Sequence, residues 1–296
     1  MRIFVTGATG WVGSAVVKDL LEAGHQVLGM ARSDAGAEAL AATGASVHRG
    51  TLEDLESLRT GAAQADGVIH TAFNHDFSKF LDNTVVEQAA IDALGGALEG
   101  TDRPLVITSG IAFMGPGRVA TEDDAIPENA LLPRNPEAAA ARWAARGVNT
   151  SLVRLPPSVH GTGDHGFIAL LTNIARQQGS SAYIGDGANH WPAVHRFDAA
   201  RVYRLALERK IGGSRYHAVA EQGVPFKAIA EAIGRGLNLP VLSKAPDEVE
   251  EHFGMFARFA GIDVEASSAL TTERLGWTPT GIDLIADLDA GHYFAG

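Results

Sequence analysis

The chain of 296 residues contains no cysteine. This absence excludes disulfide bonds, thiolate catalysis and cysteine-ligated metal sites. The sequence also lacks a long apolar run, since no segment approaches the roughly 18 residues that a membrane-spanning helix needs. The apolar stretch at the N-terminus is too short for the core of a signal peptide. We therefore expect a cytoplasmic protein.

Positive charge is also scarce, and the formal net charge at pH 7 is −11. A surface of this sign repels nucleic acid and anionic membranes, so we expect neither as a partner. Hydrophobic residues make up 46% of the chain and charged residues 20%, which is ordinary for a globular protein with a large core. An anionic small molecule must then be held locally, by a helix N-terminus or a well-placed arginine.

Short apolar runs alternate with helical patterns through the first half of the chain. This rhythm predicts an α/β fold in which helices cover both faces of a parallel sheet. The expected strands are Arg2–Val5, Gln26–Met30, Ser46–His48, Gly67–His70, Pro104–Thr108 and Thr150–Leu155. The expected helices are Trp11–Ala23, Gly36–Thr43, Leu52–Gly61, Phe77–Leu98 and Pro136–Ala145.

The alternation ends after Pro156, where loops rich in Gly, Pro and Asp separate short helical patterns near residues 197–209 and 225–237. We expect a dinucleotide-binding domain over residues 1–155, to which residues 195–220 return. Residues 156–194 and 221–296 would form a smaller substrate-binding lobe. Such a lobe would close over the strand ends, where ligands of open α/β sheets bind.

Residues 6–13 read TGATGWVG and lie between a strand and an amphipathic helix. In this pattern Gly7 permits the tight turn, Gly10 lets the backbone approach a pyrophosphate, and Gly13 lets the helix pack against the strand. The stretch GTGDHG at 161–166 has the same glycine spacing but opens no strand–helix–strand unit. We interpret that second stretch as the rim of a substrate pocket.

The second strand ends in Arg32 and Ser33, where an NAD site would prefer an acidic residue for the ribose hydroxyls. A guanidinium beside a hydroxyl suits a 2′-phosphate, so the sequence favours NADP(H). Asp34 follows directly and weighs against this interpretation. NAD(H) is the alternative cofactor.

Six motifs follow one another in an order typical of a known superfamily: TGATGWVG at 6–13, GTLED at 50–54, VIHTAF at 68–73, VITSG at 106–110, VRLPPSVHG at 153–161 and LGWTP at 275–279. Together they resemble the extended short-chain dehydrogenase/reductase superfamily, the NAD(P)-dependent epimerase/dehydratase-like proteins. The resemblance covers nearly the whole chain. It implies a Rossmann-type, doubly wound parallel sheet with a smaller C-terminal substrate-binding lobe, and a homodimer formed through Phe77–Leu98 and Pro136–Ala145.

The resemblance also implies cofactor contacts at the positions that match these motifs. They are Gly7, Thr9, Gly10, Trp11, Val12 and Gly13 at the pyrophosphate, Arg32 and Ser33 at the adenosine ribose phosphate, Thr51 and Leu52 at the adenine, Thr71, Ala72 and Phe73 at the second ribose, and Pro156, Ser158 and Val159 at the nicotinamide. Thr51 replaces the usual aspartate of the family.

The family's catalytic pair, a Tyr followed four residues later by a Lys, does not carry over. The chain has no Tyr before Tyr183 and no Lys between Lys79 and Lys210. The expected Tyr position falls near Ala130, and Arg134 lies close to the expected Lys position. Ser109 lies near the family's catalytic Ser, although TSG leaves open whether Gly110 occupies that position.

Hydride transfer to a carbonyl still leaves an oxygen that must be stabilised or protonated. His75, in the stretch HTAFNHDF, is the first candidate for this proton, against the simpler interpretation that residues 74–76 form a turn and helix cap. Ser109 and Arg134 complete the candidate catalytic set. We expect no metal, because no histidine spacing matches a metal motif.

These features predict an NADP(H)-dependent oxidoreductase of the short-chain dehydrogenase/reductase type. Its substrate would be a small carbonyl, alcohol or imine. The alternative is a catalytically inactive sensor or scaffold protein that retains an NADP(H) site. A sugar-nucleotide epimerase is a third interpretation, ranked lower because it also needs the missing Tyr.

Overall fold

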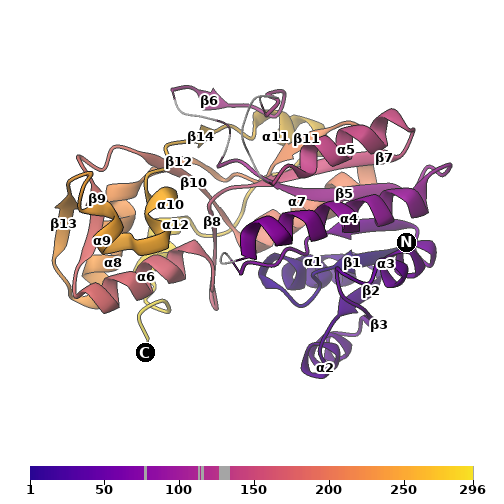
Figure 1. The fold of residues 1–296 in the computed structure, drawn as a ribbon, viewed down its shortest axis with the longest axis horizontal. Helices are drawn as coiled ribbons and strands as arrows, with labels where there is room; N and C mark the ends of the chain where they lie inside the picture. Colours follow the sequence, from indigo (N-terminus) through magenta and orange to yellow (C-terminus); the bar gives the residue numbers. More distant parts are fainter. Residues whose placement is uncertain (77–78, 113, 115–116, 127–133, 296) are drawn as a thin grey trace.

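The structure is a computed structural model that describes residues 1–76, 79–112, 114, 117–126 and 134–295. A seven-stranded sheet in the order β11-β7-β5-β4-β1-β2-β3 forms its centre (Figure 1). All six neighbouring pairs are parallel. The strands are β1 (Arg2–Thr6), β2 (Gln26–Ala31), β3 (Ser46–Arg49), β4 (Gly67–His70), β5 (Pro104–Gly110), β7 (Asn149–Leu155) and β11 (Arg215–His217).

Helices cover both faces of this sheet because each strand alternates its side chains between two cores. Ile3 and Val5 enter one core, while Phe4 between them enters the other. The first core is covered by α1 (Trp11–Glu22), α2 (Asp34–Ala42) and α7 (Arg196–Arg209). The second is covered by α3 (Leu55–Ala63), α4 (Phe80–Leu98) and α5 (Pro136–Ala145). The α/β prediction of a doubly wound parallel sheet is confirmed.

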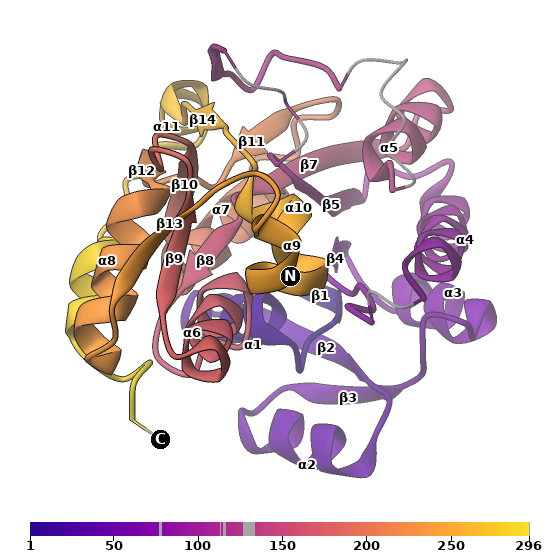
Figure 2. The same cartoon turned by 60° about the vertical axis from the view of Figure 1, so that its left-hand side comes forward.

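The remaining elements gather beside the sheet in a smaller C-terminal lobe, drawn mostly in orange and yellow (Figure 2). The lobe has strands β8 (Ser158–His160), β10 (His190–His195) and β12 (Glu221–Pro225) in one sheet and β9 (Ser181–Ile184) with β13 (Val241–Lys244) in another. Its helices are α6 (Phe167–Gln178), α8 (Phe226–Leu237), α9 (Val249–Phe253), α10 (Ala257–Ala260) and α12 (Leu284–Asp289). A third core rich in aromatic side chains, including Trp191 and Phe226, holds the lobe together.

A short two-stranded sheet and one helix join the lobe to the central sheet. Strand β14 (Glu265–Ala266) pairs with β6 (Val119–Ala120), and α11 (Ala269–Leu275) follows it. The chain also returns to the central sheet after β10: α7 packs against α1, and β11 pairs in parallel with β7. The sequence pattern did not predict β11, because a strand of three residues is too short to show periodicity.

Local capping explains where two of the helices begin. Helix α3 begins at Leu55 rather than Leu52, because the Asp54 carboxylate accepts a hydrogen bond from the Ser57 amide and so caps the helix. Helix α2 begins at Asp34 rather than Gly36, because Ser33 caps it in the same way. No helix in the described ranges is long and apolar enough to cross a membrane.

Candidate functional site

The glycine loop between β1 and α1 is shaped by close backbone contacts. Gly7 has φ +70°, and a Cβ placed there would lie 2.8 Å from the Ala72 nitrogen. A Cβ on Gly13 would lie 2.0 Å from the Gly7 carbonyl oxygen, so only glycine lets the first turn of α1 pack this tightly. Gly10 caps α1, whose first turn carries no acidic residue. The free amides at this helix N-terminus can therefore bind an anion.

Trp11 connects the glycine loop to the second lobe. Its indole nitrogen donates a hydrogen bond to the Val159 carbonyl oxygen at 2.8 Å. The Arg196 guanidinium carbon lies 3.9 Å from the centre of the Trp11 ring, and His165 meets that ring edge-on. The structure thus brings the expected pyrophosphate loop and the expected nicotinamide border at Val159 together.

The turn after β2 holds the residues expected at the adenosine ribose. Arg32 is exposed, and the Ser33 hydroxyl accepts a hydrogen bond from the Gly36 amide at 3.1 Å. Gly36 also adjoins Thr9 of the glycine loop. Arg49 at the end of β3 reaches this turn and donates to the Ser33 carbonyl oxygen at 2.6 Å. The sequence pattern singled out Arg32 and Ser33 but not Arg49, although Arg49 directly follows the neighbouring predicted strand.

The other expected cofactor residues follow the ends of three strands. Thr51 and Leu52 follow β3, and Leu52 packs against the second core. Thr71 follows β4, and its hydroxyl donates to the Thr6 carbonyl oxygen at 2.8 Å. Pro156 and Ser158 follow β7 and are buried, and the Ser158 hydroxyl has no hydrogen-bond partner among the described residues.

Arg134 lies beside the segment that follows β4. Its Nε and Nη2 atoms donate to the two carboxylate oxygens of Glu87 at 2.8 and 2.5 Å. Its guanidinium carbon lies 4.4 Å from the centre of the Phe73 ring, and His75 meets that same ring edge-on. The structure therefore brings Arg134 and His75 together around Phe73. Glu87 on α4 is the partner that sequence analysis missed.

Two histidines near Arg134 have lowered pKa values. Burial, the charge of Arg134 and the charge of His165 lower the pKa of His75 below its ordinary value, although the ring still reaches solvent. Burial and then Arg134 lower the pKa of His70 to about 3. Both rings are therefore neutral at pH 7. A neutral His75 can accept a proton or donate an N–H hydrogen bond, but it cannot act as an imidazolium acid at that pH.

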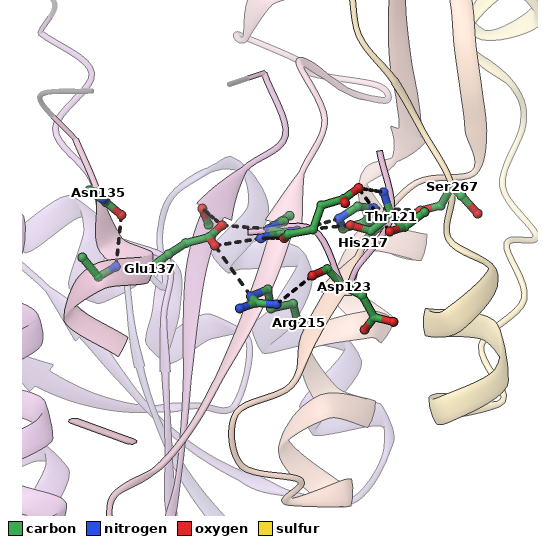
Figure 3. Close-up of polar contacts among 11 residues, drawn as sticks. Thr121, Asp123, Asn135, Glu137, Arg215, His217 and Ser267 are labelled. Carbon is green, nitrogen blue, oxygen red and sulfur yellow. Dashed lines mark hydrogen bonds and ion pairs between the residues drawn. The ribbon is translucent and has the colours of Figure 1, made fainter. Parts of the chain in front are cut away.

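Ser109 belongs to a different, buried network, of which Figure 3 labels Glu137, His217 and Ser267. Its hydroxyl donates to the Glu137 carboxylate at 2.9 Å, and the same carboxylate receives two hydrogen bonds from Arg154 at 2.7 Å each. Arg154 also lies 3.1 Å from Nε2 of His217, whose Nδ1 lies 2.7 Å from the Ser267 carbonyl oxygen. The Ser109 proton is thus engaged within the protein. A Cβ on the neighbouring Gly110 would have open space around it.

The comparisons with known proteins agree with this geometry. Residues 7–154, half of the chain, match the family described as NAD(P)H-binding. The chain is also 49% identical to the uncharacterized protein C2A9.02 of Schizosaccharomyces pombe, over 99% of this chain and 100% of the relative. The chain belongs to the NAD(P)H-binding family. The predicted resemblance to the extended short-chain dehydrogenase/reductase superfamily is confirmed for the NAD(P)H-binding domain and for the fold.

Two further matches from this superfamily cover nearly the whole chain. The UDP-glucose 4-epimerase of Streptomyces lividans is 27% identical over 98% of this chain and 94% of the relative. The structure of DesIV, a dTDP-glucose 4,6-dehydratase from Streptomyces venezuelae with NAD and TYD bound, has a TM-score of 0.78 at 20% identity. It covers 99% of this chain and 96% of that one. At this identity the second match concerns the fold alone.

A dinucleotide fits the glycine loop of this NAD(P)H-binding protein, because the loop is built where a Cβ on Gly7 or Gly13 would collide with backbone. The expected Tyr position near Ala130 lies outside the described residues. Arg134, near the expected Lys position, already donates hydrogen bonds to both carboxylate oxygens of Glu87. Within the part of the chain that the structure describes, no three His, Asp or Glu side chains form a group that could hold a metal ion.

Proposed function

We propose that this chain is an NADP(H)-dependent oxidoreductase that transfers a hydride to or from a small carbonyl, alcohol or imine. The observation that carries the proposal is the proximity of three features: the glycine loop, the Thr71–Phe73 segment that touches it, and the cluster of Phe73, His75 and Arg134. The bound dinucleotide supplies or accepts the hydride at its nicotinamide. The proton must be handled by the chain or by water.

His75 is the residue we assign to that proton. Because burial, Arg134 and His165 lower its pKa, the ring is unprotonated at neutral pH and free to accept a proton, although more weakly than an ordinary imidazole. In alcohol oxidation it would take the hydroxyl proton as the hydride leaves the carbon. In the reverse direction the neutral ring would donate a hydrogen bond to the carbonyl oxygen, with water completing the protonation. Hydride transfer to a protonated imine gives a neutral amine and needs no acid. Of the three substrate classes, an imine therefore depends least on the missing Tyr.

Arg134 and Ser109 receive supporting roles in this proposal. Arg134 contributes positive charge beside His75 and adds to the effect of burial, which is the larger cause of the lowered pKa of that ring. It is a poor proton donor because a guanidinium keeps its proton and stays charged near neutral pH. Ser109 donates a hydrogen bond to the Glu137 carboxylate, so its hydroxyl would orient the end of β5 rather than hold a substrate oxygen. A preference for NADP(H) is supported by exposed Arg32 at the end of β2.

The test is NADPH consumption with a panel of aldehydes, ketones and imines, run beside NADP⁺ reduction with the matching alcohols and amines. His75→Gln should lower kcat at least tenfold with an unchanged dissociation constant for NADPH. His25→Gln is the control, because His25 pairs with Glu208 instead. Tight NADPH binding without turnover on any substrate would contradict the enzyme proposal.

That contradicting result would favour the second candidate, a sensor or scaffold that binds NADP(H) without chemistry. One observation supports it: Arg134 and Ser109 are both engaged by buried carboxylates. For the cofactor itself, Arg32→Ala should weaken NADPH binding far more than NADH binding. Equal weakening of both would remove the argument for a 2′-phosphate at Arg32.

A further inference from the structure

Arg49 reaches from β3 across to the turn after β2. The strands are in register there, with Ala31 opposite Arg49. The Arg49 Nη1 atom donates to the Ser33 carbonyl oxygen at 2.6 Å, and Nη2 donates to the Asp34 carboxylate at 2.8 Å. The Arg32 carbonyl oxygen lies 3.4 Å from the same Nη2. A second guanidinium therefore lies at the turn where Arg32 and Ser33 would meet the adenosine ribose.

The carboxylate that pairs with Arg49 is loosely held. The Asp34 side chain is 93% exposed and the Arg49 side chain 49% exposed. Ion pairs between exposed side chains are weak, because water and salt screen both charges. Asp34 is the first residue of α2, where its charge also favours the helix N-terminus. An incoming anion of higher charge can displace Asp34 from the guanidinium at little cost.

We propose that Arg49 is the second cation of a 2′-phosphate site and that Asp34 is an internal counter-ion which the 2′-phosphate displaces. The inference rests on the proposed preference for NADP(H). A phosphate monoester carries nearly two negative charges at pH 7 and offers three acceptor oxygens. A guanidinium binds such a group through two parallel hydrogen bonds. The ribose hydroxyl of NAD(H) is uncharged and leaves the Asp34–Arg49 pair intact.

A simpler explanation is that Arg49 only anchors the turn, through the Ser33 carbonyl oxygen and Asp34. The two explanations predict opposite changes in NADPH affinity for Asp34→Asn. If Asp34 is an anchor, its loss loosens the turn and weakens the binding of NADPH and of NADH together. If Asp34 competes with the phosphate, its loss frees the Arg49 guanidinium and strengthens the binding of NADPH alone.

The experiment measures equilibrium dissociation constants on the full chain for NADPH and NADH, and for the fragments adenosine 2′,5′-bisphosphate and 5′-AMP. Arg49→Gln should weaken NADPH and the bisphosphate about tenfold, and NADH and 5′-AMP less than twofold. Asp34→Asn should strengthen NADPH and the bisphosphate about two- to fivefold. Arg49→Lys, which keeps the charge and loses the fork, should fall between wild type and Arg49→Gln.

Arg59→Gln is the matched control. Arg59 is also 49% exposed and also pairs with a carboxylate, Glu56 on the same helix. Arg59→Gln removes one positive charge, as Arg49→Gln does, without touching the turn after β2. The ratio of its dissociation constants for NADPH and NADH should therefore stay at the wild-type value. Thermal unfolding of each variant shows whether the fold is intact.

The inference fails if Arg49→Gln and Asp34→Asn leave the wild-type NADPH to NADH ratio unchanged, or if Asp34→Asn weakens both cofactors. In either case the preference carried by Arg32 and the oxidoreductase proposal stand. A wild-type protein that binds the bisphosphate and 5′-AMP equally would overturn the NADP(H) preference and this inference together. None of these measurements depends on turnover, so they leave the proposed reaction to its own test.

Discussion

Glu87 holds the guanidinium of Arg134 in a two-point fork, with Nε and Nη2 at 2.8 and 2.5 Å from its two carboxylate oxygens. Glu87 lies on α4 and is 3% exposed, while Arg134 immediately precedes the N-cap of α5. The pair therefore ties two helices together and fixes the cation over Phe73.

Breaking this pair should destabilise the fold. Glu87→Gln removes the charge partner of a mostly buried guanidinium, and we expect the free energy of unfolding to fall by about 2 kcal/mol. Arg134→Gln should cost a similar amount. Because the two residues share one interaction, the double variant should lose at least ~1 kcal/mol less than the sum. Urea unfolding of all four proteins measures this coupling, and additive losses would show that the fork contributes no stability.

The buried pair of Arg154 and Glu137 should matter more. Arg154 has no exposed surface, so Glu137→Gln would leave its charge uncompensated in the interior. The expected loss of unfolding free energy is about 3–5 kcal/mol. Ser109→Ala removes one neutral donor from Glu137 and should cost about 1 kcal/mol. Urea denaturation at pH 7 compares the unfolding free energies of the Glu137→Gln and Ser109→Ala variants. Equal losses would contradict the claim that the buried charge of Arg154 dominates this network.

These pairs mark the boundary of what the sequence could predict. The glycine loop, six strands of the central sheet and the helices between them follow from periodicity and capping, which act within a few residues. Glu87 and Glu137 carried no such signal, because each resembled an ordinary helical glutamate. Their partners lie 47 and 17 residues away along the chain and meet them only in the folded state. Strand β11 was missed for a related reason, since it is defined by its pairing with β7.

The glycine loop gives a sharper test of cofactor binding. Gly13→Ala places a Cβ 2.0 Å from the Gly7 carbonyl oxygen, a contact that forces the first turn of α1 away from the loop. We expect NADPH affinity to fall at least a hundredfold, or about 3 kcal/mol, because the helix N-terminus no longer faces the pyrophosphate. Fluorescence titration with NADPH measures the loss.

Gly110→Ala is the control for this substitution. A Cβ there has no neighbour within 4 Å, and its φ lies outside the left-handed region. NADPH affinity and stability should therefore stay close to wild type, within about 0.5 kcal/mol. If Gly13→Ala bound NADPH as well as Gly110→Ala, the glycine loop would not be the pyrophosphate site.

The last prediction concerns acid stability and rests on His70. This ring is 1% exposed, its Nδ1 lies 2.7 Å from the Thr6 hydroxyl, and its Nε2 has no partner in the described residues. Burial, with Arg134 as a second cause, lowers the pKa of His70 from 6.5 to about 3. Between those two pH values the unfolded chain binds a proton at this ring and the folded chain does not. The free energy of unfolding must then rise with pH across this window. The full contribution of His70 to stability is present above pH 6.5.

His70→Asn removes the titration while retaining a polar group beside Thr6. Wild type should lose about 1.4 kcal/mol per pH unit more than the variant as the pH falls from 6.5 toward 3. Urea unfolding between pH 4 and 7 gives both curves, and only their difference belongs to His70, because burial also lowers the pKa values of His217 and His252. Parallel curves would mean that the folded protein accepts a proton on His70, which the cation of Arg134 and the closed surroundings of the ring argue against.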